Sequence, residues 1–239
     1  MRARVWRYAG AAAALTAVLT CSSSTASSSG WGPTPWWGHG RVDLVSSAQP
    51  SEAAPKVRDD ATRIVWLRGP GARADAVATS SADCAGCRGA ARTVQVVWAG
   101  RSPGLRVDNV ATAWASCPDC GATAISVQLV LTRHPTGLTA NNRALAVNGA
   151  CTRCTTSAAA YQVVLVTRHW VDLDELREQL RAWVRDHPAG PGPAVSQRST
   201  TTPRAAQGTG AQLRDLAGLV TEQTHGHVVR KAVEVRTGP

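Results

Sequence analysis

Three pairs of cysteines, each pair separated by two residues, are the side chains of this sequence whose type and spacing could do chemistry. A Cys-x-x-Cys pair can close as a disulfide, can share a zinc ion with a second pair, or can cycle as a redox dithiol. A seventh cysteine, Cys21, stands apart near the N-terminus. The pairs are Cys84/Cys87, Cys117/Cys120 and Cys151/Cys154.

The pairs lie within a unit of roughly 33 residues that occurs three times between residues 62 and 169. In each copy a glutamine follows the first cysteine at the same distance, and an Asp or Asn precedes the pair. We interpret the glutamines as mid-strand residues that hydrogen-bond neighbouring strands or each other, because a buried amide must be paired. The repeat positions are Gln95, Gln128 and Gln162 after the pairs, and Asp75, Asn109 and Asn142 before them.

The segments around the pairs alternate between large and small residues, which is the period of a β-strand. In residues 122–131, for example, Ile125, Val127 and Leu129 alternate with Ala124, Ser126 and Gln128. We therefore expect an α+β fold: an antiparallel β-meander built from three Cys-x-x-Cys hairpins. The alternative is an array of α-helical repeats, since alanine favours helices and helix pairs repeat at a similar period.

A helix is predicted after the repeats. Asp172 and Glu175 have the spacing of a capping box, and the pattern stops before Pro188. We expect this amphipathic helix to cover one face of the sheet. Its apolar face is predicted to consist of Leu173, Leu176, Leu180, Trp183 and Val184.

The expected domain organisation has five parts. A basic start followed by an alanine-rich run reads as a signal peptide, and Cys21 offers a less typical lipoprotein site. Beyond the repeat domain we expect a flexible linker, then a short helix and a terminal strand that pairs at the sheet edge. The parts are a signal peptide at 1–26, a disordered Trp/Pro/Gly/Ser-rich arm at 27–61, the repeat domain with its helix at 62–187, a linker at 188–210, and the final helix and strand at 211–239.

Three tryptophans mark the N-terminal arm, namely Trp31, Trp36 and Trp37. Indole rings suit docking in a groove or at a membrane interface, and they would equally well cover an edge of the sheet. We retain both interpretations. No transmembrane span is expected once the signal has been cleaved, because its apolar run is too short to cross a bilayer.

The geometry of a meander favours disulfides within each pair. Neighbouring turns would lie every second strand, about 9 to 10 Å apart, whereas a disulfide tolerates Cα separations up to roughly 7 Å. Zinc is the alternative cofactor, held by Cys117, Cys120, Cys151 and Cys154, because Cys117-Pro118-Asp119-Cys120-Gly121 matches a zinc-knuckle turn. A redox dithiol is a second alternative, although no helix start flanks the pairs to lower a thiol pKa.

The charge balance bears on partners. The formal net charge is +10, and removal of the three signal-region arginines leaves +7. This charge favours an anionic cell-wall polymer as partner, although scattered arginines also accumulate by drift. We expect no specific nucleic-acid binding. The sequence contains no metalloprotease, serine-hydrolase or phosphate-loop motif, so an enzyme is the less favoured class.

The stretch from Asn142 to Val166 resembles a known repeat: Asn-x-Ala-x-Ala, then Cys-x-x-Cys, then x-Thr-x-Ala-x-Ala-x-Gln-Val-Val-Leu-Val. It is similar to the Cys-x-x-Cys repeats in the exported C-terminal region of actinobacterial proteins named as peptide zinc metalloproteases, and to small secreted proteins of unknown role. The resemblance covers about residues 62 to 190. It implies export and brings no protease activity, because the protease motif has no counterpart here. The first copy departs from the pattern, with Asp75 in place of Asn, which suits a capping unit.

Together these features predict a secreted or envelope-associated, non-catalytic repeat protein. Its disulfides would staple the fold, and it would bind a protein or an anionic wall polymer. The alternatives are a zinc-binding module and a thiol-disulfide redox protein. The sequence does not indicate an oligomeric state.

Overall fold

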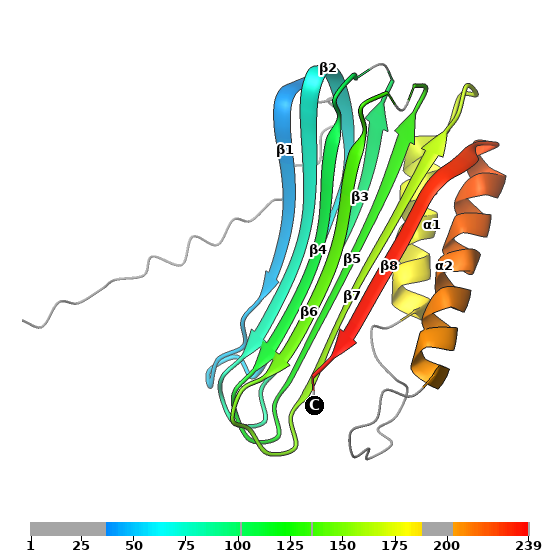
Figure 1. Cartoon of the computed structure of the whole chain (residues 1–239). Coiled ribbons are helices and arrows are strands. Elements are labelled where there is room, and N and C mark those ends of the chain that lie inside the picture. Colours follow the sequence, from blue (N-terminus) through cyan, green and yellow to red (C-terminus); the bar gives the residue numbers. More distant parts are fainter. Residues whose placement is uncertain (1–36, 101, 135, 188–202, 239) are drawn as a thin grey trace, which may run out of the picture. The chain divides into compact units, whose positions relative to one another are not determined.

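The computed structural model describes residues 37–100, 102–134, 136–187 and 203–238. Most of these residues form strands, and two helices follow the repeats (Figure 1). The elements are β1 (Trp37–Ala48), β2 (Lys56–Ala82), β3 (Arg88–Ala99), β4 (Arg106–Ala115), β5 (Gly121–Thr132), β6 (Thr139–Asn148), β7 (Thr155–Val166), α1 (Leu173–Asp186), α2 (Pro203–Thr224) and β8 (His227–Thr237).

The repeats wind as a flattened β-solenoid. Each strand pairs in parallel with the strand one repeat away, so that equivalent residues lie side by side, as in Arg88↔Gly121↔Thr155. The strands form two stacked sheets. The open sheet contains β1, residues 73–82 of β2, β4 and β6. The covered sheet contains residues 56–66 of β2, β3, β5, β7 and β8.

The expected antiparallel meander of three hairpins is therefore wrong. Each Cys-x-x-Cys turn carries the chain from the open sheet to the covered sheet, and each Gly/Pro turn carries it back. The next copy consequently stacks on the previous one in parallel. Side-chain alternation is the same in a hairpin and in a solenoid coil, so the pattern of large and small residues did not separate them. The α-helical repeat array is also wrong, because the copies are strands.

The Gly/Pro turns stack at one end of the coils. Gly71, Gly104 and Gly137 have φ angles of 67°, 70° and 69°, in the left-handed region that glycine adopts without strain. The amide of Gly71 donates to Pro103, and that of Gly104 donates to Thr136. A Cβ on Gly137 would lie 3.1 Å from the amide nitrogen of Gly104. Glycine is thus required here both for its backbone angles and for close stacking.

Small residues fill the space between the two sheets. Their short side chains let the sheets approach closely, and larger aliphatic residues occupy the part near the Gly/Pro turns. The alanine part of this core consists of Ala48, Ala78, Ala91, Ala111, Ala113, Ala122, Ala124, Ala144, Ala158 and Ala160.

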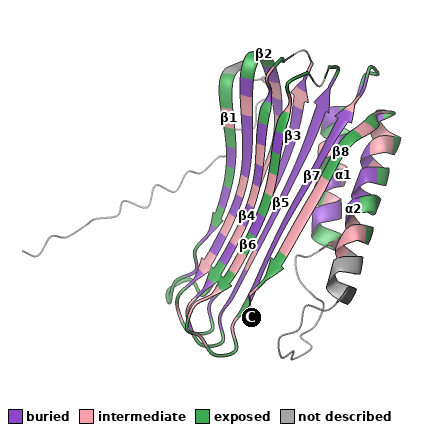
Figure 2. Cartoon of the chain, viewed as in Figure 1, coloured by how far each residue is buried: buried purple, intermediate pink, exposed green. Residues whose placement is uncertain are grey.

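A second cluster of large apolar side chains lies on the outer face of the covered sheet, under the two helices. Figure 2 shows that β5 and β7 of this sheet are mostly buried. The side chain of Asp172 caps α1 by accepting hydrogen bonds from the amides of Asp174 and Glu175. The predicted apolar face of this helix is confirmed, because the buried residues of α1 are Leu173, Leu176, Leu180, Trp183 and Val184.

The helix α2 extends the cover. Its buried residues include Leu216 and Val220. The hydroxyl of Tyr161 donates to the Gln212 side chain at 2.7 Å, and burial raises the pKa of Tyr161 to about 12. The sequence predicted that one helix covers the sheet, whereas two helices cover it.

The ends of the chain differ from expectation in two further places. Residues 37–48 and 56–61, predicted to belong to a disordered arm, form β1 and the start of β2. The predicted linker at 188–210 overlaps the beginning of α2 at Pro203. The terminal strand β8 pairs antiparallel with β7, at the edge of the sheet as expected. Within the described residues, neither helix has the length and apolarity needed to cross a membrane.

Two leucines test the assignment of covered and open faces. Leu180 on α1 is fully buried against the covered sheet, whereas Leu145 on β6 is 54% exposed. We expect Leu180→Ala to lower the free energy of unfolding by about 2 to 5 kcal/mol, and Leu145→Ala to change it by less than about 0.5 kcal/mol. Urea unfolding followed by tryptophan fluorescence measures both. Equal losses for the two variants would contradict the arrangement of the helices over the covered sheet.

Candidate functional site

The three Cys-x-x-Cys turns stack at the opposite end of the coils from the Gly/Pro turns. Each pair is closed as a disulfide, with Cα separations of 5.3, 5.6 and 6.0 Å from the first pair to the third. Backbone hydrogen bonds join the turns: the amide of Gly86 donates to Pro118, and the amide of Asp119 donates to Thr152. The cysteine turns are thus part of the same backbone ladder as the strands.

The predicted pairing of the cysteines within each turn is confirmed, and three of the six sulfurs are buried. Cys87, Cys117 and Cys120 are 1%, 3% and 1% exposed, and they pack with Ala82 and Ala115 in a small apolar cluster at this end of the core. The other three cysteines, Cys84 in the first turn and Cys151 and Cys154 in the third, are only partly buried. A disulfide is apolar and has no charge to solvate, so it can close the end of the core between the two sheets.

The Cys84–Cys87 turn shows this role most plainly. Its disulfide joins residues three apart, and the amide of Cys87 donates to the carbonyl oxygen of Cys84 at 2.9 Å. The carbonyl oxygen of Cys87 accepts from the amide of Gly121 in the next coil at 2.8 Å. Cys87 is therefore a structural residue that ends the turn and begins the ladder to β5, and it offers no sulfur to a substrate or metal from solvent.

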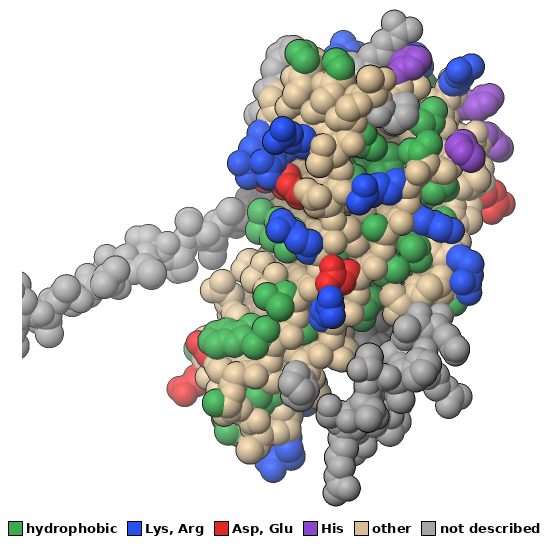
Figure 3. Space-filling view, in the orientation of Figure 1, with side chains coloured by type: hydrophobic (Ala, Val, Ile, Leu, Met, Phe, Trp, Pro, Cys, Tyr) green, Lys and Arg blue, Asp and Glu red, His purple; other side chains and the backbone are tan. Residues whose placement is uncertain are grey.

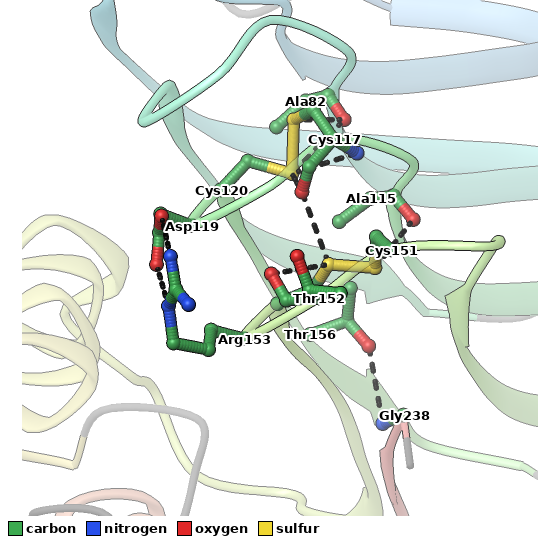
Figure 4. Close-up of a disulfide and its surroundings, with 11 residues drawn as sticks. Ala82, Ala115, Cys117, Asp119, Cys120, Cys151, Thr152, Arg153, Thr156 and Gly238 are labelled. Carbon is green, nitrogen blue, oxygen red and sulfur yellow. Dashed lines mark hydrogen bonds and ion pairs between the residues drawn. A yellow bond between two sulfur atoms is a disulfide. The ribbon is translucent and has the colours of Figure 1, made fainter.

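The second and third turns also pair through charged side chains (Figure 4). The Arg153 guanidinium donates to both carboxylate oxygens of Asp119, with an Nη2–O distance of 2.6 Å for one of them. This hydrogen bond lowers the pKa of Asp119. Both side chains are at least half exposed, so solvent screens the pair and its contribution to stability is small.

The stacking corrects one step of the sequence argument. Neighbouring cysteine turns belong to adjacent coils, about 4.8 Å apart as in any strand ladder, and not to every second strand. The sulfur of Cys154 lies 3.1 Å from the carbonyl oxygen of Cys117 in the preceding turn. Distance alone therefore does not exclude bonds or a shared metal between copies, although each pair is closed on itself.

The chemistry of the turns depends on this oxidised state. A disulfide sulfur carries no thiolate, which is the form that binds zinc or attacks a substrate. Among the described residues, no group of three or more His, Cys, Asp or Glu side chains is placed to hold a metal ion. Zinc binding by Cys117, Cys120, Cys151 and Cys154 would require both pairs to be reduced. Cys21 lies outside the described residues.

A ladder of buried amides runs through the core at the level of the repeat glutamines. The Nε2 of Gln128 donates to Oε1 of Gln95 at 2.8 Å, and Nε2 of Gln162 donates to Oε1 of Gln128 at 2.7 Å. Each Nε2 also donates across the core to backbone of the open sheet, for example to Ala74 from Gln128. This bonding matches the interpretation that the glutamines pair with one another and with neighbouring strands.

The repeat asparagines form a second, shorter ladder. The Nδ2 of Asn109 donates to Oδ1 of Asn142 at 2.7 Å and to the carbonyl of Tyr161 at 2.9 Å. The Nδ2 of Asn142 donates to the carbonyl of Ala160. The asparagines on the open sheet thus donate to the covered sheet, and the glutamines on the covered sheet donate to the open sheet. Both ladders fasten the two sheets together, and neither presents a ligand site to solvent.

The sequence suggested that Asp75 is the counterpart of the repeat asparagines, but the structure shows that it is not. It pairs in register with Asp108, whereas the residue that pairs with Asn109 is Ala76. Arg73 donates to Asp75 and to Asp108, and Arg41 also donates to Asp75. The hydrogen bond that Arg73 donates to Asp75 is the largest cause of the raised pKa of Arg73. These residues form a charged band across the outer face of the open sheet, near the Gly/Pro turns.

At the other end of the open sheet the outer face is apolar. Trp114 on β4 lies beside Val147 on β6, and Leu145 is two residues away along β6. Their exposed fractions are 43%, 38% and 54%. We call Trp114, Leu145 and Val147 the apolar corner. Figure 3 shows this side of the molecule, with hydrophobic side chains lying among basic and acidic side chains.

Sequence reasoning missed the apolar corner. A hairpin model puts the strands of all copies in one sheet under the helix, so it leaves no reason to examine Trp114 and Val147 as neighbours. The signal was present, because both residues come shortly before the first cysteine of their copies, and equivalent repeat positions lie side by side in a solenoid. Of the arm tryptophans, Trp31 and Trp36 lie outside the described residues, and Trp37 begins β1, paired with Trp66.

Comparisons with known proteins add no relative. The scan against protein-family models finds no match, and neither do the searches of curated proteins and of solved structures.

The amide ladder can be tested with a substitution that changes charge and little else. In Gln128→Glu the new carboxyl lies in the fully buried ladder, which raises its pKa in the folded state above the ordinary value of about 4.3. The variant is then most stable at low pH. As pH rises past the unfolded-state pKa, only the unfolded chain releases the proton, so the free energy of unfolding falls by about 1.4 kcal/mol per pH unit.

Urea unfolding between about pH 3.5 and 7 measures this slope, with Gln49→Glu at an exposed position as the control that should show little change. A Gln128→Glu variant whose stability did not depend on pH would contradict the buried ladder.

The cysteine state gives the next prediction. In secreted protein denatured without reductant, we expect the six paired cysteines to show no free thiol and reduction to release all six. Replacing Cys84 and Cys87 together by serine should lower the free energy of unfolding by about 2 kcal/mol, because the closed loop is short. Mass spectrometry reads the pairing, the cleavage site and any lipid on Cys21 together. Six thiols in native protein with about one zinc per chain would support the metal-binding alternative instead.

Proposed function

We propose that this chain is an exported, non-catalytic repeat protein of the cell envelope that binds a protein partner through its open sheet. The observation that carries the proposal is the asymmetry of the two sheets. The helices cover the outer face of one sheet, and the outer face of the other exposes Trp114, Leu145 and Val147. Exposed apolar residues that gather at one place on a rigid surface are typical of an interaction site.

The rigidity of the surface supports a binding role. The strands of the open sheet are held by in-register pairing and by amides that bond to the sheet beneath. A partner that docks on such a surface meets side chains already in place, so little conformational freedom is lost on binding. The three disulfides would preserve this surface outside the cell, where thiols are oxidised. The resemblance of the repeats to exported regions of other proteins agrees with that compartment.

A second candidate is binding of an anionic wall polymer. At the start of the covered sheet, near the cysteine turns, a shallow hollow is lined by Lys56, Arg58 and Arg88 together with Gly89 and Gly121. Lys56, Arg88 and Gly121 are direct neighbours across three strands. A row of cations along a sheet would attract a linear polyanion, and salt would weaken that attraction. The zinc-binding and redox alternatives would require reduced turns.

The protein-binding role can be tested with peptide-displaying phage panned on the immobilised mature protein. We expect selected peptides to bind the wild type and to lose about tenfold or more in affinity against Trp114→Ala, because an exposed tryptophan is a common binding hot spot. Trp170→Ala is the matched control, since Trp170 is 86% exposed on the loop before α1. Peptides that bind all three proteins equally would place the binding surface elsewhere and contradict the proposal.

A further inference from the structure

The two sheets end differently. In the covered sheet the last repeat strand, β7, is followed by the antiparallel strand β8. In the open sheet the last strand is β6, and no strand of the described residues pairs with its free edge. At this end the open sheet thus has one strand fewer than the covered sheet (Figure 1).

The position beside the free edge of β6 lies over β8 of the covered sheet. Each strand of the open sheet lies over two successive strands of the covered sheet: β4 lies over β5 and β7, and β6 lies over β7 and β8. One more strand beside β6 would therefore lie over β8. The side chains of β8 on the core side are Arg230, Ala232, Glu234 and Arg236, which pair in register with the inward residues of β7.

The free edge of β6 carries backbone groups ready to pair. The amides of Thr139 and Gly149 donate to Leu105 and Ala115 of the preceding coil. Because N–H and C=O groups alternate in direction along a strand, the amides of the even-numbered residues between them, among them Ala144 and Ala146, point to the free edge. Leu145 and Val147 are exposed on this same strand, although natural proteins usually protect such edges.

A buried amide oxygen points to the same place. The glutamine ladder runs from Gln95 through Gln128 to Gln162, each Oε1 accepting from the next Nε2. At its end the Oε1 of Gln162 is buried and has no hydrogen-bond partner among the described residues. The neighbouring position on β8 is Ala232, whose side chain offers no donor. A buried acceptor without a donor lowers the stability of the fold, so a donor group placed beyond β7 would stabilise this oxygen.

We propose that the free edge of β6 accepts one extended peptide strand from a protein partner, which completes the open sheet over β8. This inference rests on the proposed protein-binding function and specifies the kind of partner. The strand would carry small residues on its inward side, where β6 has Ala140, Ala144 and Ala146. An Asn or Gln level with Asn142 would bring a donor toward Oε1 of Gln162. Apolar outward residues would extend the apolar corner, and an acidic outward residue would meet Arg143.

The position of β8 excludes a second copy of this chain as the occupant, because that copy would bring a covered-sheet strand to the place that β8 already fills. If β6 paired with β6 of another copy about a two-fold axis, the two β8 strands would occupy the same place beneath the new pair. If β1 of another copy followed β6, residues 56–66 of that copy would occupy the place of β8. A single peptide strand brings no second strand with it, so it does not collide with β8.

A synthetic peptide with the sequence of β4, residues 106–115, is a suitable probe, because β4 already stacks in this way on β2 and β6. It presents Asn109, Ala111 and Ala113 inward and Trp114 outward. We use the peptide with Val110→Glu to face Arg143, labelled with a fluorophore, and measure its anisotropy against the mature protein. We expect saturable binding to one site per chain.

Backbone methylation of the probe gives the decisive comparison. In the parallel register, the amides of residues 110 and 112 point to β6, and those of residues 111 and 113 point to solvent. Methylating the first pair of amides should weaken binding at least about tenfold, since two hydrogen bonds are lost. Methylating the second pair should leave affinity within about twofold. An antiparallel register reverses the two sets, so the inference requires that one set matters and the other does not.

Two variants complete the design. Ala146→Pro in the protein removes an amide from the free edge and none from the pairing with β4, so it should also weaken binding about tenfold, with Ala146→Ser as the control. Asn109→Ala in the probe should weaken binding severalfold. Should Ala146→Pro fail to fold, the methylated probes still decide the question.

The outcomes separate this inference from the proposed function. Equal effects of the two methylation sets, or no binding of the probe, would overturn strand addition. If phage-selected peptides nevertheless lost affinity for Trp114→Ala, the protein-binding role would stand without it. Dimerisation of the native protein that Ala146→Pro abolishes, measured by sedimentation, would make a second copy the occupant and would also overturn the inference.

Discussion

The parallel, in-register stacking of one coil on the next is the constraint on which the rest of the structure depends. It brings equal residues of successive copies side by side, as in Gln95, Gln128 and Gln162. An amide can both donate and accept, so within a column of identical amides each one donates to one neighbour and accepts from the other, and only the ends of the column lack such a neighbour. The same stacking joins the cysteine turns and the glycine turns by backbone hydrogen bonds. A displacement by one residue would turn every inward alanine outward and break both amide ladders at once.

The buried amides explain how an alanine-rich core specifies a single arrangement. Alanine side chains are small and similar, so they pack almost equally well in several registers and give little discrimination. A glutamine in that core needs hydrogen-bond partners, and a glutamine at the same position of the next coil supplies one, because an unpaired buried amide loses its hydrogen bonds with water. Gln128 bonds to both of its neighbours in the ladder and to the backbone of the opposite sheet. It thereby fixes the register of three coils and the contact between two sheets.

Sequence patterns predicted the elements better than their connection. The buried face of α1 was fully readable because helical periodicity depends on residues close in the chain. Strand alternation around Gln128 was readable for the same reason. The direction of pairing was not, since hairpins and solenoid coils have the same alternation. The repeat itself held the evidence: in a meander Gln95 and Gln128 would lie two strands apart and unpaired, whereas in a parallel stack they bond. Buried amides at equal positions of a repeat should therefore be read as a sign of parallel stacking.

The errors at the candidate site have the same origin. The spacing of Cys84 and Cys87 predicted a disulfide within the pair, which is a local property, but it did not reveal that Cys87 closes the end of a core between two sheets. That burial depends on the neighbouring coil, and so does the position of Trp114 beside Val147. Both followed from the direction of pairing and were missed with it.

The stacking also creates a difficulty at its ends, and the way the chain meets it shapes the functional surface. Any coil exposes two strand edges to the next, so an unprotected solenoid tends to grow by adding copies. Here β8 reverses direction and closes the covered sheet, with the amide of Gly238 fastened to Thr156. Because the open sheet has no equivalent of β8 among the described residues, one edge is blocked for whole coils and accessible to a single strand. Leu145 and Val147 of the apolar corner lie on that accessible edge strand, with Trp114 on the strand beside it, and the helices occupy the opposite face. The way the stack ends thus places an accessible strand edge next to an exposed apolar surface.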